Sequence, residues 1–296
     1  MSWQKTVVNQ LLRRWMKPRA RQQLADPQAV RRRIERLPTL RRPPQGFVLR
    51  TDRHGTDWIE PCRGTVARTV LYLHGGAYAV CSPRTHRSVT FQLARDAAAR
   101  VVAIDYRLAP EHPFPAALED ALAAYRQLVA SGTPAHSIVL GGDSAGGGLS
   151  LATLLALRDA RDPLPAGAVL FSPWTDLTGS GASMRDNATS DVMFSAPDVL
   201  AAARLYLAQA PADTPLASPL LGALHGLPPL FIQASDSEIL RDDATRLAER
   251  VRAAGGRAEL ALWPEMPHAW HCLGRVLPEA REALRLAAGF IRRVAP

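Results

Sequence analysis

Cysteine is scarce in this chain. Only three of the 296 residues are cysteines, at positions 62, 81 and 272. Their odd number and scattered positions match neither a disulfide framework nor the paired spacing of a zinc site. Thiols without partners suit a reducing compartment, so we expect a cytoplasmic protein.

Long hydrophobic runs are missing as well. No stretch of 18 apolar residues occurs, although 47% of the residues are hydrophobic. A bilayer-spanning helix needs about 20 such residues, so we expect no membrane span, and the first residues lack the apolar core of a signal peptide. The composition predicts a chain with a sizeable core, built as one large α/β domain or two small ones.

Acidic residues are almost absent from the first 50 positions. This segment holds 13 Lys and Arg but only Asp26 and Glu35, a local charge of +11. The whole chain carries +9, so the remaining residues carry about −2. A nucleic-acid-binding protein would be more uniformly basic, whereas this excess belongs to one segment, and we expect no nucleic-acid partner.

The basic segment has apolar residues at helical spacing. A first amphipathic helix is predicted, with basic side chains opposite an apolar face made by Trp3, Val7, Leu11, Leu12, Trp15 and Met16. A second short helix begins at Pro27 with Asp26 as its N-cap, and its inward residues are Val30, Ile34 and Leu37. We expect these residues to form helices whose apolar faces pack on the body. The alternative is an interfacial helix attracted to anionic lipid, with weak surface association.

The stretch Gly142-Asp143-Ser144-Ala145-Gly146 has the pattern G-x-S-x-G. It follows a β-branched and aliphatic run that predicts a buried strand, and it precedes good helix formers from Leu149 to Ala160. In that position the pattern predicts a nucleophile elbow, where a serine on a sharp turn needs neighbours without side chains. An ordinary glycine-rich turn is the other interpretation. A phosphate-binding loop does not fit, because no G-x-G-x-x-G occurs and Gly148 stands where Lys is needed.

Predicted strands and helices alternate through most of the chain from Phe47 onward. The order predicts a mostly parallel central sheet with helices on both faces, the α/β class. The interval Thr175 to Ala210 breaks the alternation and is too long for a connecting loop. Because ligands of open α/β sheets bind at the carboxyl ends of the strands, we expect an inserted cap there, at about residues 175–210.

A serine nucleophile also needs a base, an acid that orients the base, and amide donors for the oxyanion. Of the three histidines after Ser144, only His268 stands in a loop directly after a predicted strand. The expected oxyanion donors are the amides of Gly75, Gly76 and Ala145. His268 and His271 have the spacing of a zinc pair, but no third ligand stands out, so no metal and no cofactor are expected.

The ordered series of motifs resembles the hormone-sensitive-lipase family of α/β-hydrolases, in its bacterial carboxylesterase branch. The matching segments cover about residues 45–296: His74-Gly75-Gly76-Ala77-Tyr78, Asp105 to Ala116, Gly142 to Gly147, Ser172 to Leu177, Leu240-Arg241-Asp242 and the Pro267-His268 loop. The resemblance implies the α/β-hydrolase fold with residues 46–296 as the catalytic domain. It further implies a helical cap made by the N-terminal helices of residues 1–45 and by the insertion at about 175–210. It also implies Ser144 as nucleophile, His268 as base and the same oxyanion hole.

Two features depart from the family pattern. Ala77 replaces the third glycine of the usual His-Gly-Gly-Gly run, and the usual Asp-Pro-Leu around the catalytic acid is absent. Two carboxylates then compete for the role of triad acid. Register counted back from Leu240 favours Glu238, whereas Asp236 lies nearer the strand end and has the commoner residue type; the choice stays open.

These observations together predict a serine carboxylesterase that hydrolyses short-chain acyl esters through a Ser-His-Glu/Asp triad. Its partner is a small acyl ester, of which the sequence specifies neither the alcohol part nor the chirality. An amide or N-acetyl hydrolase using the same site is an alternative, and so is a non-catalytic small-molecule receptor of this fold. The last strand, Ala258–Trp263, is expected at a sheet edge, where unpaired backbone groups favour a homodimer.

Overall fold

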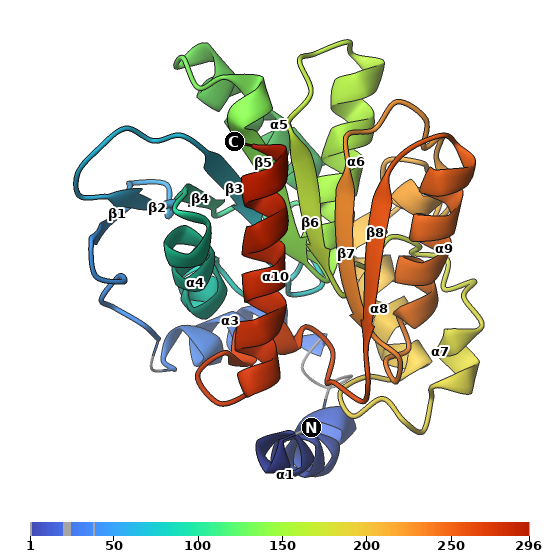
Figure 1. The fold of residues 1–296 in the computed structure, drawn as a ribbon. Helices are drawn as coiled ribbons and strands as arrows, with labels where there is room; N and C mark the ends of the chain where they lie inside the picture. The colour runs from blue at the N-terminus through green and yellow to red at the C-terminus, as the bar shows by residue number, and fades with distance from the viewer. Residues whose placement is uncertain (1, 20–24, 38, 296) are drawn as a thin grey trace.

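A computed structural model describes residues 2–19, 25–37 and 39–295. An eight-stranded sheet runs through the molecule in the order β1-β2-β4-β3-β5-β6-β7-β8 (Figure 1). The β1–β2 and β2–β4 pairs are antiparallel and all other pairs are parallel. The strands are β1 (Phe47–Thr51), β2 (Asp57–Pro61), β3 (Thr69–Leu73), β4 (Arg100–Ile104), β5 (Ile138–Asp143), β6 (Gly167–Phe171), β7 (Leu230–Ser235) and β8 (Ala258–Trp263).

Helices cover both faces of the sheet. On one face lie α4 (Arg87–Ala97) and α10 (Pro278–Val294), which pack on each other; on the other lie α5 (Ala116–Ala130), α6 (Ala145–Asp159) and α9 (Arg241–Ala253) (Figure 1). Strand β3 shows why both faces must be covered. Val70 and Tyr72 enter one hydrophobic core while Leu71 and Leu73 enter the other, and all four are fully buried. Apolar side chains at every position are typical of a parallel strand buried on both sides.

The α/β-hydrolase architecture expected from the sequence is therefore present. One boundary differs: α6 begins at Ala145 rather than Leu149. Three glycines in its first turn have low helix propensity, which hides this turn from the sequence pattern. The close approach of neighbouring chain requires them, because a Cβ at Gly148 would collide with the Trp174 carbonyl oxygen.

The interval 175–210 holds two helices and no strand. These are the short α7 (Ser183–Asp186) and α8 (Ala196–Leu207). Phe194 and Val199 from this segment line a cavity that also contains Ser144. The insertion thus lies over the carboxyl end of β5, where the serine stands.

The N-terminal segment is helical but does not pack on the face expected from its sequence. It forms α1 (Trp3–Leu11), a π-helical turn η1 (Leu12–Met16) and a 3-10 turn η2 (Lys17–Arg19) at one end of the molecule (Figure 1). The prediction that the whole apolar face packs inward is wrong for four residues. The exposed fractions are 73% for Trp3, 43% for Val7, 53% for Leu11 and 56% for Trp15.

Polar anchors explain this rotation. Lys5 is buried and its Nζ lies 2.7 Å from Glu265 Oε2, while Asn9 Nδ2 donates to the Glu265 carbonyl at 2.9 Å. Arg13 and Lys17 donate to backbone carbonyls of residues 188–191 in the insertion. These contacts place α1 and η1 across the insertion and the loop after β8. The face of the helix that turns inward then carries Leu12 and Met16, which line the cavity.

The second N-terminal helix, α3 (Pro27–Glu35), begins where the sequence predicts. Asp26 Oδ1 accepts the Ala29 N–H at 2.8 Å, which confirms the N-cap. Val30 and Ile34 line the cavity, but Leu37 is 54% exposed, so its predicted inward position is wrong because it follows the last helical turn. Within the described parts of the chain, no helix has the length and apolarity needed to cross a membrane.

Candidate active site

Ser144 stands on a sharp turn between β5 and α6. Its backbone has φ 52° and ψ −121°, a strained combination for a residue with a side chain. The turn is held by the Ser144 N–H, which donates to the Phe171 carbonyl at 2.8 Å. Only glycine fits at position 146, because a Cβ there would collide with the Leu73 carbonyl oxygen. The geometry is that of a nucleophile elbow at the carboxyl end of a central strand.

His268 and Glu238 meet although 30 residues separate them. His268 lies in the loop after β8, Glu238 lies in the turn after β7, and His268 Nδ1 is 2.6 Å from Glu238 Oε2. Both side chains are buried, and Glu238 is only 1% exposed. Asp236 is exposed instead, and its Oδ1 accepts the Glu265 N–H at 2.8 Å. Of the two competing carboxylates, Glu238 contacts the imidazole and Asp236 shapes the adjoining turns.

Glu238 favours the charged form of the His268 imidazole. Burial lowers the pKa of His268, but the hydrogen bond and the negative charge of Glu238 outweigh burial and hold this pKa above its usual value. A carboxylate on Nδ1 leaves Nε2 as the nitrogen able to exchange a proton with a substrate or a hydroxyl. This is the arrangement that a general base needs.

Ser172 positions both members of this pair, a role that the sequence analysis did not assign. It follows β6, and its Oγ donates to Glu238 Oε1 at 3.0 Å and accepts the Ala269 N–H at 3.2 Å. The Ser235 N–H also donates to Glu238 Oε1, at 2.7 Å. A buried serine directly after a central strand was the available signal. Its partners could not be inferred, because they come from two distant loops.

The insertion holds the Glu238 turn from the other side. Asp191 is buried, and its Oδ2 accepts the Ile239 N–H at 2.9 Å, while Asn187 Nδ2 donates to the carbonyls of Asp236 and Glu238 at 2.8 Å. Phe194 meets the His268 ring edge-on with the ring centroids 5.4 Å apart. No sequence signal marked Asp191 or Asn187, because an isolated polar residue in an irregular segment has many equivalent interpretations.

One predicted oxyanion donor is already engaged. The Gly75 N–H donates to Asp143 Oδ1 at 3.1 Å, and an amide has only one hydrogen to give. Gly76 and Ala77 line the cavity, and within the described residues neither their amides nor the Ala145 amide has an acceptor. The expectation for Gly75 is therefore corrected: its neighbour Ala77 is the available donor, beside Gly76 and Ala145.

Asp143 holds in place the loop of residues 75–77, which we call the oxyanion loop. Besides Gly75, its Oδ1 accepts the Tyr72 hydroxyl at 2.7 Å, and its Oδ2 lies 3.3 Å from His86 Nε2. Burial raises the pKa of Asp143, but the adjacent His86 charge outweighs it and holds that pKa far below the usual value. Burial likewise lowers the pKa of His86, and Asp143 raises it well above the usual value. The two groups form a buried ion pair beside the elbow.

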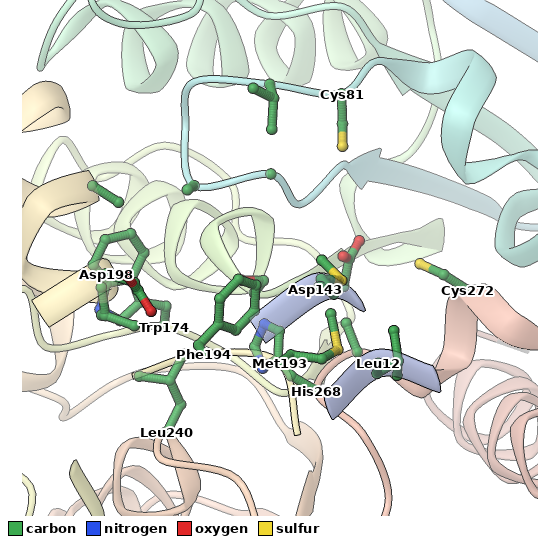
Figure 2. Close-up of a pocket in the computed structure, with 18 of the residues that line it drawn as sticks. Leu12, Cys81, Asp143, Trp174, Met193, Phe194, Asp198, Leu240, His268 and Cys272 are labelled. Atoms are coloured by element: carbon green, nitrogen blue, oxygen red, sulfur yellow. The ribbon is translucent and has the colours of Figure 1, made fainter. Parts of the chain in front are cut away.

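The cavity in front of Ser144 has a volume of about 380 Å³. Cys81, Asp143 and Cys272 lie on one side of it and Trp174 and Asp198 on the other, with His268 and Phe194 between them (Figure 2). Its walls are mostly apolar and come from the N-terminal helices, the insertion and the sheet loops. Such a lining suits the acyl part of a small ester.

The other histidines after Ser144 do not join this site. His271 Nε2 contacts Gln233 Oε1 at 2.9 Å, and its ring stacks on Phe171 with the centroids 4.2 Å apart. Burial lowers the pKa of His271 to about 3, so this ring is neutral and packs in the core. The rings of His268 and His271, considered as a zinc pair, have separate partners in Glu238 and Gln233.

Comparison with known proteins identifies the family. A model of the alpha/beta hydrolase fold family matches residues 70–272. An esterase of the bacterial hormone-sensitive lipase family has a crystal structure that matches with a TM-score of 0.89 at 40% identity, covering 100% of this chain and 99% of that chain. The chain belongs to the hormone-sensitive-lipase family of α/β-hydrolases.

Two further proteins are similar to this chain. The structure of EstE5 soaked with p-nitrophenyl butyrate matches with a TM-score of 0.91 at 35% identity over 99% of each chain. An acetyl-hydrolase of Streptomyces hygroscopicus is 47% identical over 84% of this chain and 83% of its own. Like the esterases that it resembles, this chain is a carboxylic ester hydrolase.

Proposed function

We propose that the protein is a serine carboxylesterase for short-chain acyl esters, with Ser144 as nucleophile, His268 as base and Glu238 as the acid that orients it. The observation that supports this most is the 2.6 Å contact between His268 Nδ1 and Glu238 Oε2, made at a cavity that Ser144 and His268 both line. The elbow places Ser144 at the cavity, and a carboxylate-oriented imidazole is the base that turns a weak hydroxyl into a nucleophile.

The reaction begins when Ser144 Oγ attacks the ester carbonyl and His268 Nε2 takes the hydroxyl proton. Glu238 stays ionised and stabilises the imidazolium that forms. The amides of Gly76, Ala77 and Ala145 donate to the oxyanion of the tetrahedral intermediate, aided by the N-terminus of α6. His268 then gives its proton to the leaving alcohol, and water activated by the same imidazole releases the acid from the acyl-enzyme.

The cavity walls support a preference for short acyl chains. The N-terminal helices and the insertion act as a cap in this proposal, because Leu12 and Phe194 line the cavity that also contains Ser144. A series of p-nitrophenyl esters tests the preference directly. Turnover should be fastest for butyryl and hexanoyl esters and fall sharply for palmitoyl. Preference for emulsified long-chain esters would contradict the proposal and favour a lipase.

An N-acetyl hydrolase is a second candidate, because the relative from Streptomyces hygroscopicus carries the name acetyl-hydrolase. Paired substrates separate the two activities: p-nitrophenyl acetate carries an ester and p-nitroacetanilide carries the matching amide. An esterase should hydrolyse the first and leave the second nearly untouched. A receptor that uses this fold without turnover would give neither product nor an initial burst.

The proposal includes a homodimer that works in the cytoplasm. Strand β8 ends the sheet and pairs only with β7, and Leu262 on it is 45% exposed, which leaves an edge on which a second copy can pair. The three cysteines are all free thiols, as a reducing compartment requires. Light scattering at micromolar concentration should give twice the chain mass of 32.1 kDa, and a monomer mass would contradict the dimer.

A further inference from the structure

Three metal-ligating groups gather beside the nucleophile elbow. His86 ends the 3-10 turn η3 (Pro83–His86), Asp143 ends β5, and Cys272 lies in the 3-10 turn η6 (Trp270–Leu273). The ligand atoms of the three side chains all lie within 4.8 Å of one another. All three line the cavity that contains Ser144, and Figure 2 shows Asp143 and Cys272 on the same side of it.

The spacing fits a tetrahedral cation. Bonds of about 2.0–2.1 Å from zinc to nitrogen and oxygen place two such ligands about 3.3–3.4 Å apart. His86 Nε2 and Asp143 Oδ2 are 3.3 Å apart already. The Cys272 thiol adds a soft ligand, which favours a thiophilic cation over magnesium or calcium. The cavity leaves room for a fourth ligand such as water.

Outer contacts hold two of these ligands in place. His86 Nδ1 lies 2.9 Å from Thr85 Oγ1 and 3.3 Å from the Ser82 carbonyl, so a proton on Nδ1 leaves Nε2 free to ligate. Asp143 Oδ1 is held by the Tyr72 hydroxyl, which leaves Oδ2 for the cation. Such outer hydrogen bonds orient ligands in metal sites generally.

We propose that His86, Asp143 and Cys272 bind a thiophilic divalent cation of the Zn²⁺ type, and that binding inhibits the enzyme. The cation takes the place of the proton between His86 and Asp143 and releases the thiol proton of Cys272. The cation lies in the wall of the cavity beside Ser144. It also binds the Asp143 carboxylate, which accepts the Gly75 N–H next to the expected oxyanion donors. Only the inhibition rests on the proposed esterase function.

Cobalt titration tests binding without any assay of turnover. Co²⁺ added to the full-length enzyme should produce the absorption of a tetrahedral cobalt thiolate, and Zn²⁺ should displace it. Cys272→Ser and Cys272→Ala should lose the thiolate band, whereas Cys62→Ser, which changes an exposed cysteine, should keep it. A band that is absent, or that survives both Cys272 variants, overturns the site.

Inhibition is then measured on the same set of proteins. Zn²⁺ should inhibit the Cys62→Ser variant and the parent enzyme alike, and a chelator should reverse the effect. Losing an outer-shell partner costs roughly 10–100-fold in metal affinity, so loss of the Cys272 ligand should raise the inhibitory Zn²⁺ concentration at least that much. Equal inhibition of all variants overturns the link between this site and activity, even where cobalt binds.

A separate observation concerns the exposed face of α1 and η1. Trp3, Val7, Leu11 and Trp15 recur every four residues, and each is more than two fifths exposed, so they form an apolar stripe along one side of the segment. The opposite side is anchored to the body through Lys5 and Glu265. We call residues 3, 7, 11 and 15 the N-terminal stripe.

Two arginines lie against Trp15 at one end of the N-terminal stripe. The guanidinium carbons of Arg14 and Arg19 lie 6.0 and 5.2 Å from the Trp15 ring centroid. Arg32, Arg33 and Arg36 are exposed on and beside α3. Of the two acidic residues among the first 50, Glu35 is paired with Arg84.

We infer that the N-terminal stripe docks on an anionic membrane surface. Tryptophan at the headgroup level, aliphatic side chains below it and flanking arginines are the features of an interfacial helix. The same segment contributes Leu12 and Met16 to the cavity wall, so docking brings the cavity close to the lipid surface. Esters that partition into a bilayer would reach Ser144 from that side.

Vesicle sedimentation tests the docking. The full-length protein should sediment with phosphatidylglycerol/phosphatidylcholine vesicles, less so at high salt, and not with phosphatidylcholine alone. Trp3→Ser/Leu11→Ser/Trp15→Ser should abolish binding while leaving hydrolysis of a water-soluble ester unchanged. The control Val48→Ser/Val276→Ser/Leu286→Ser removes apolar residues elsewhere that are 48%, 50% and 45% exposed, and it should still bind. Equal vesicle binding by both triple variants would show that the N-terminal stripe does not dock on the membrane. A change of molar mass in the stripe variant would show that a second copy of the chain covers the stripe instead.

Discussion

Two carboxylates that stand two residues apart after β7 have opposite surroundings. Glu238 is 1% exposed and contacts His268, whereas Asp236 is exposed and caps the turn at Glu265. Glu238→Gln should therefore lower kcat by orders of magnitude with little change in KM, because it removes the charge that stabilises the imidazolium. Asp236→Asn is the isosteric control and should cost far less. If Asp236→Asn is the more damaging change in steady-state kinetics, Glu238 is not the triad acid.

The contact between Glu238 and His268 predicts the pH dependence of activity. The base must be neutral to accept a proton, and Glu238 raises the pKa of His268 despite the opposing effect of burial. The acidic limb of kcat/KM should then lie above the usual histidine pKa of about 6.5. In Glu238→Gln the residual activity should show this limb shifted to lower pH. An unshifted limb in the pH–rate profile would mean that another group controls the ionisation.

Ser144 is the predicted site of covalent chemistry. Its strained backbone and its position at the cavity single it out among the serines near His268. Ser144→Ala should abolish ester turnover and labelling by an organophosphonate, while the circular dichroism spectrum and melting temperature stay close to those of the parent. Ser172 is the alternative target nearest to the triad acid, so peptide mapping of any remaining label would reveal a wrong assignment.

At the scale of elements, the junction of α1 and η1 places two adjacent leucines in different surroundings. Leu12 lines the cavity, whereas Leu11 is 53% exposed. If the N-terminal helices act as the cap, Leu12→Ser should raise KM for a soluble butyrate ester several-fold, because it places a hydroxyl in the apolar acyl site. Leu11→Ser provides the control at the neighbouring position and should leave KM unchanged. Equal KM values for both variants would remove η1 from the substrate site.

Deleting residues 1–20 extends this argument to the whole segment. The deletion removes the anchors from Lys5, Arg13 and Lys17 to the loop after β8 and to the insertion. Asp191, whose carbonyl accepts from Lys17, also holds the Ile239 amide beside Glu238. KM should therefore rise and the melting temperature should fall. Removing a purely peripheral tether would cause neither change.

At the scale of the whole molecule, the buried pair of His86 and Asp143 contributes to the free energy of unfolding. Both side chains are almost fully buried, and removing one partner of such a pair costs about 3–5 kcal/mol. His86→Gln should lower the unfolding free energy by about that amount in a denaturant titration. His86→Gln/Asp143→Asn should recover part of the loss, since no unpaired charge remains buried.

The sign of the pH dependence follows from the two shifts. The pKa of His86 is raised in the folded protein. The stabilisation from His86 is therefore complete below the pKa of histidine in the unfolded chain, and it is lost as the pH rises toward the pKa in the folded protein. The pKa of Asp143 is lowered in the folded protein. The stabilisation from Asp143 is therefore complete above the pKa of aspartate in the unfolded chain, and it is lost as the pH falls toward the pKa in the folded protein. The difference between parent and His86→Gln should therefore be largest between about pH 4 and 6.5. A constant difference from pH 4 to 9 would show that the pair is not ionised.

Local sequence determined the nucleophile elbow and the order of strands and helices. Glycines at 142 and 146 around Ser144, an apolar run before it and helix formers after it specify a strand, a tight turn and a helix, because each depends on residues adjacent in the chain. The motif series from His74 to His268 likewise specified the family, and the length of the interval 175–210 indicated the insertion. Register along the motifs also favoured Glu238 over Asp236.

Tertiary structure alone decided the contacts between distant segments. Gly75 looked like an oxyanion donor until Asp143 was seen to accept its only N–H, and Ser172 and Asp191 acquired roles from loops 50 to 100 residues away. Helical spacing defined an apolar face on α1, but the ion pair of Lys5 with Glu265 turned Leu12 inward and left Trp3 and Trp15 outside. Periodicity records which residues share a face; which face is buried depends on the polar partners that the rest of the fold brings to it.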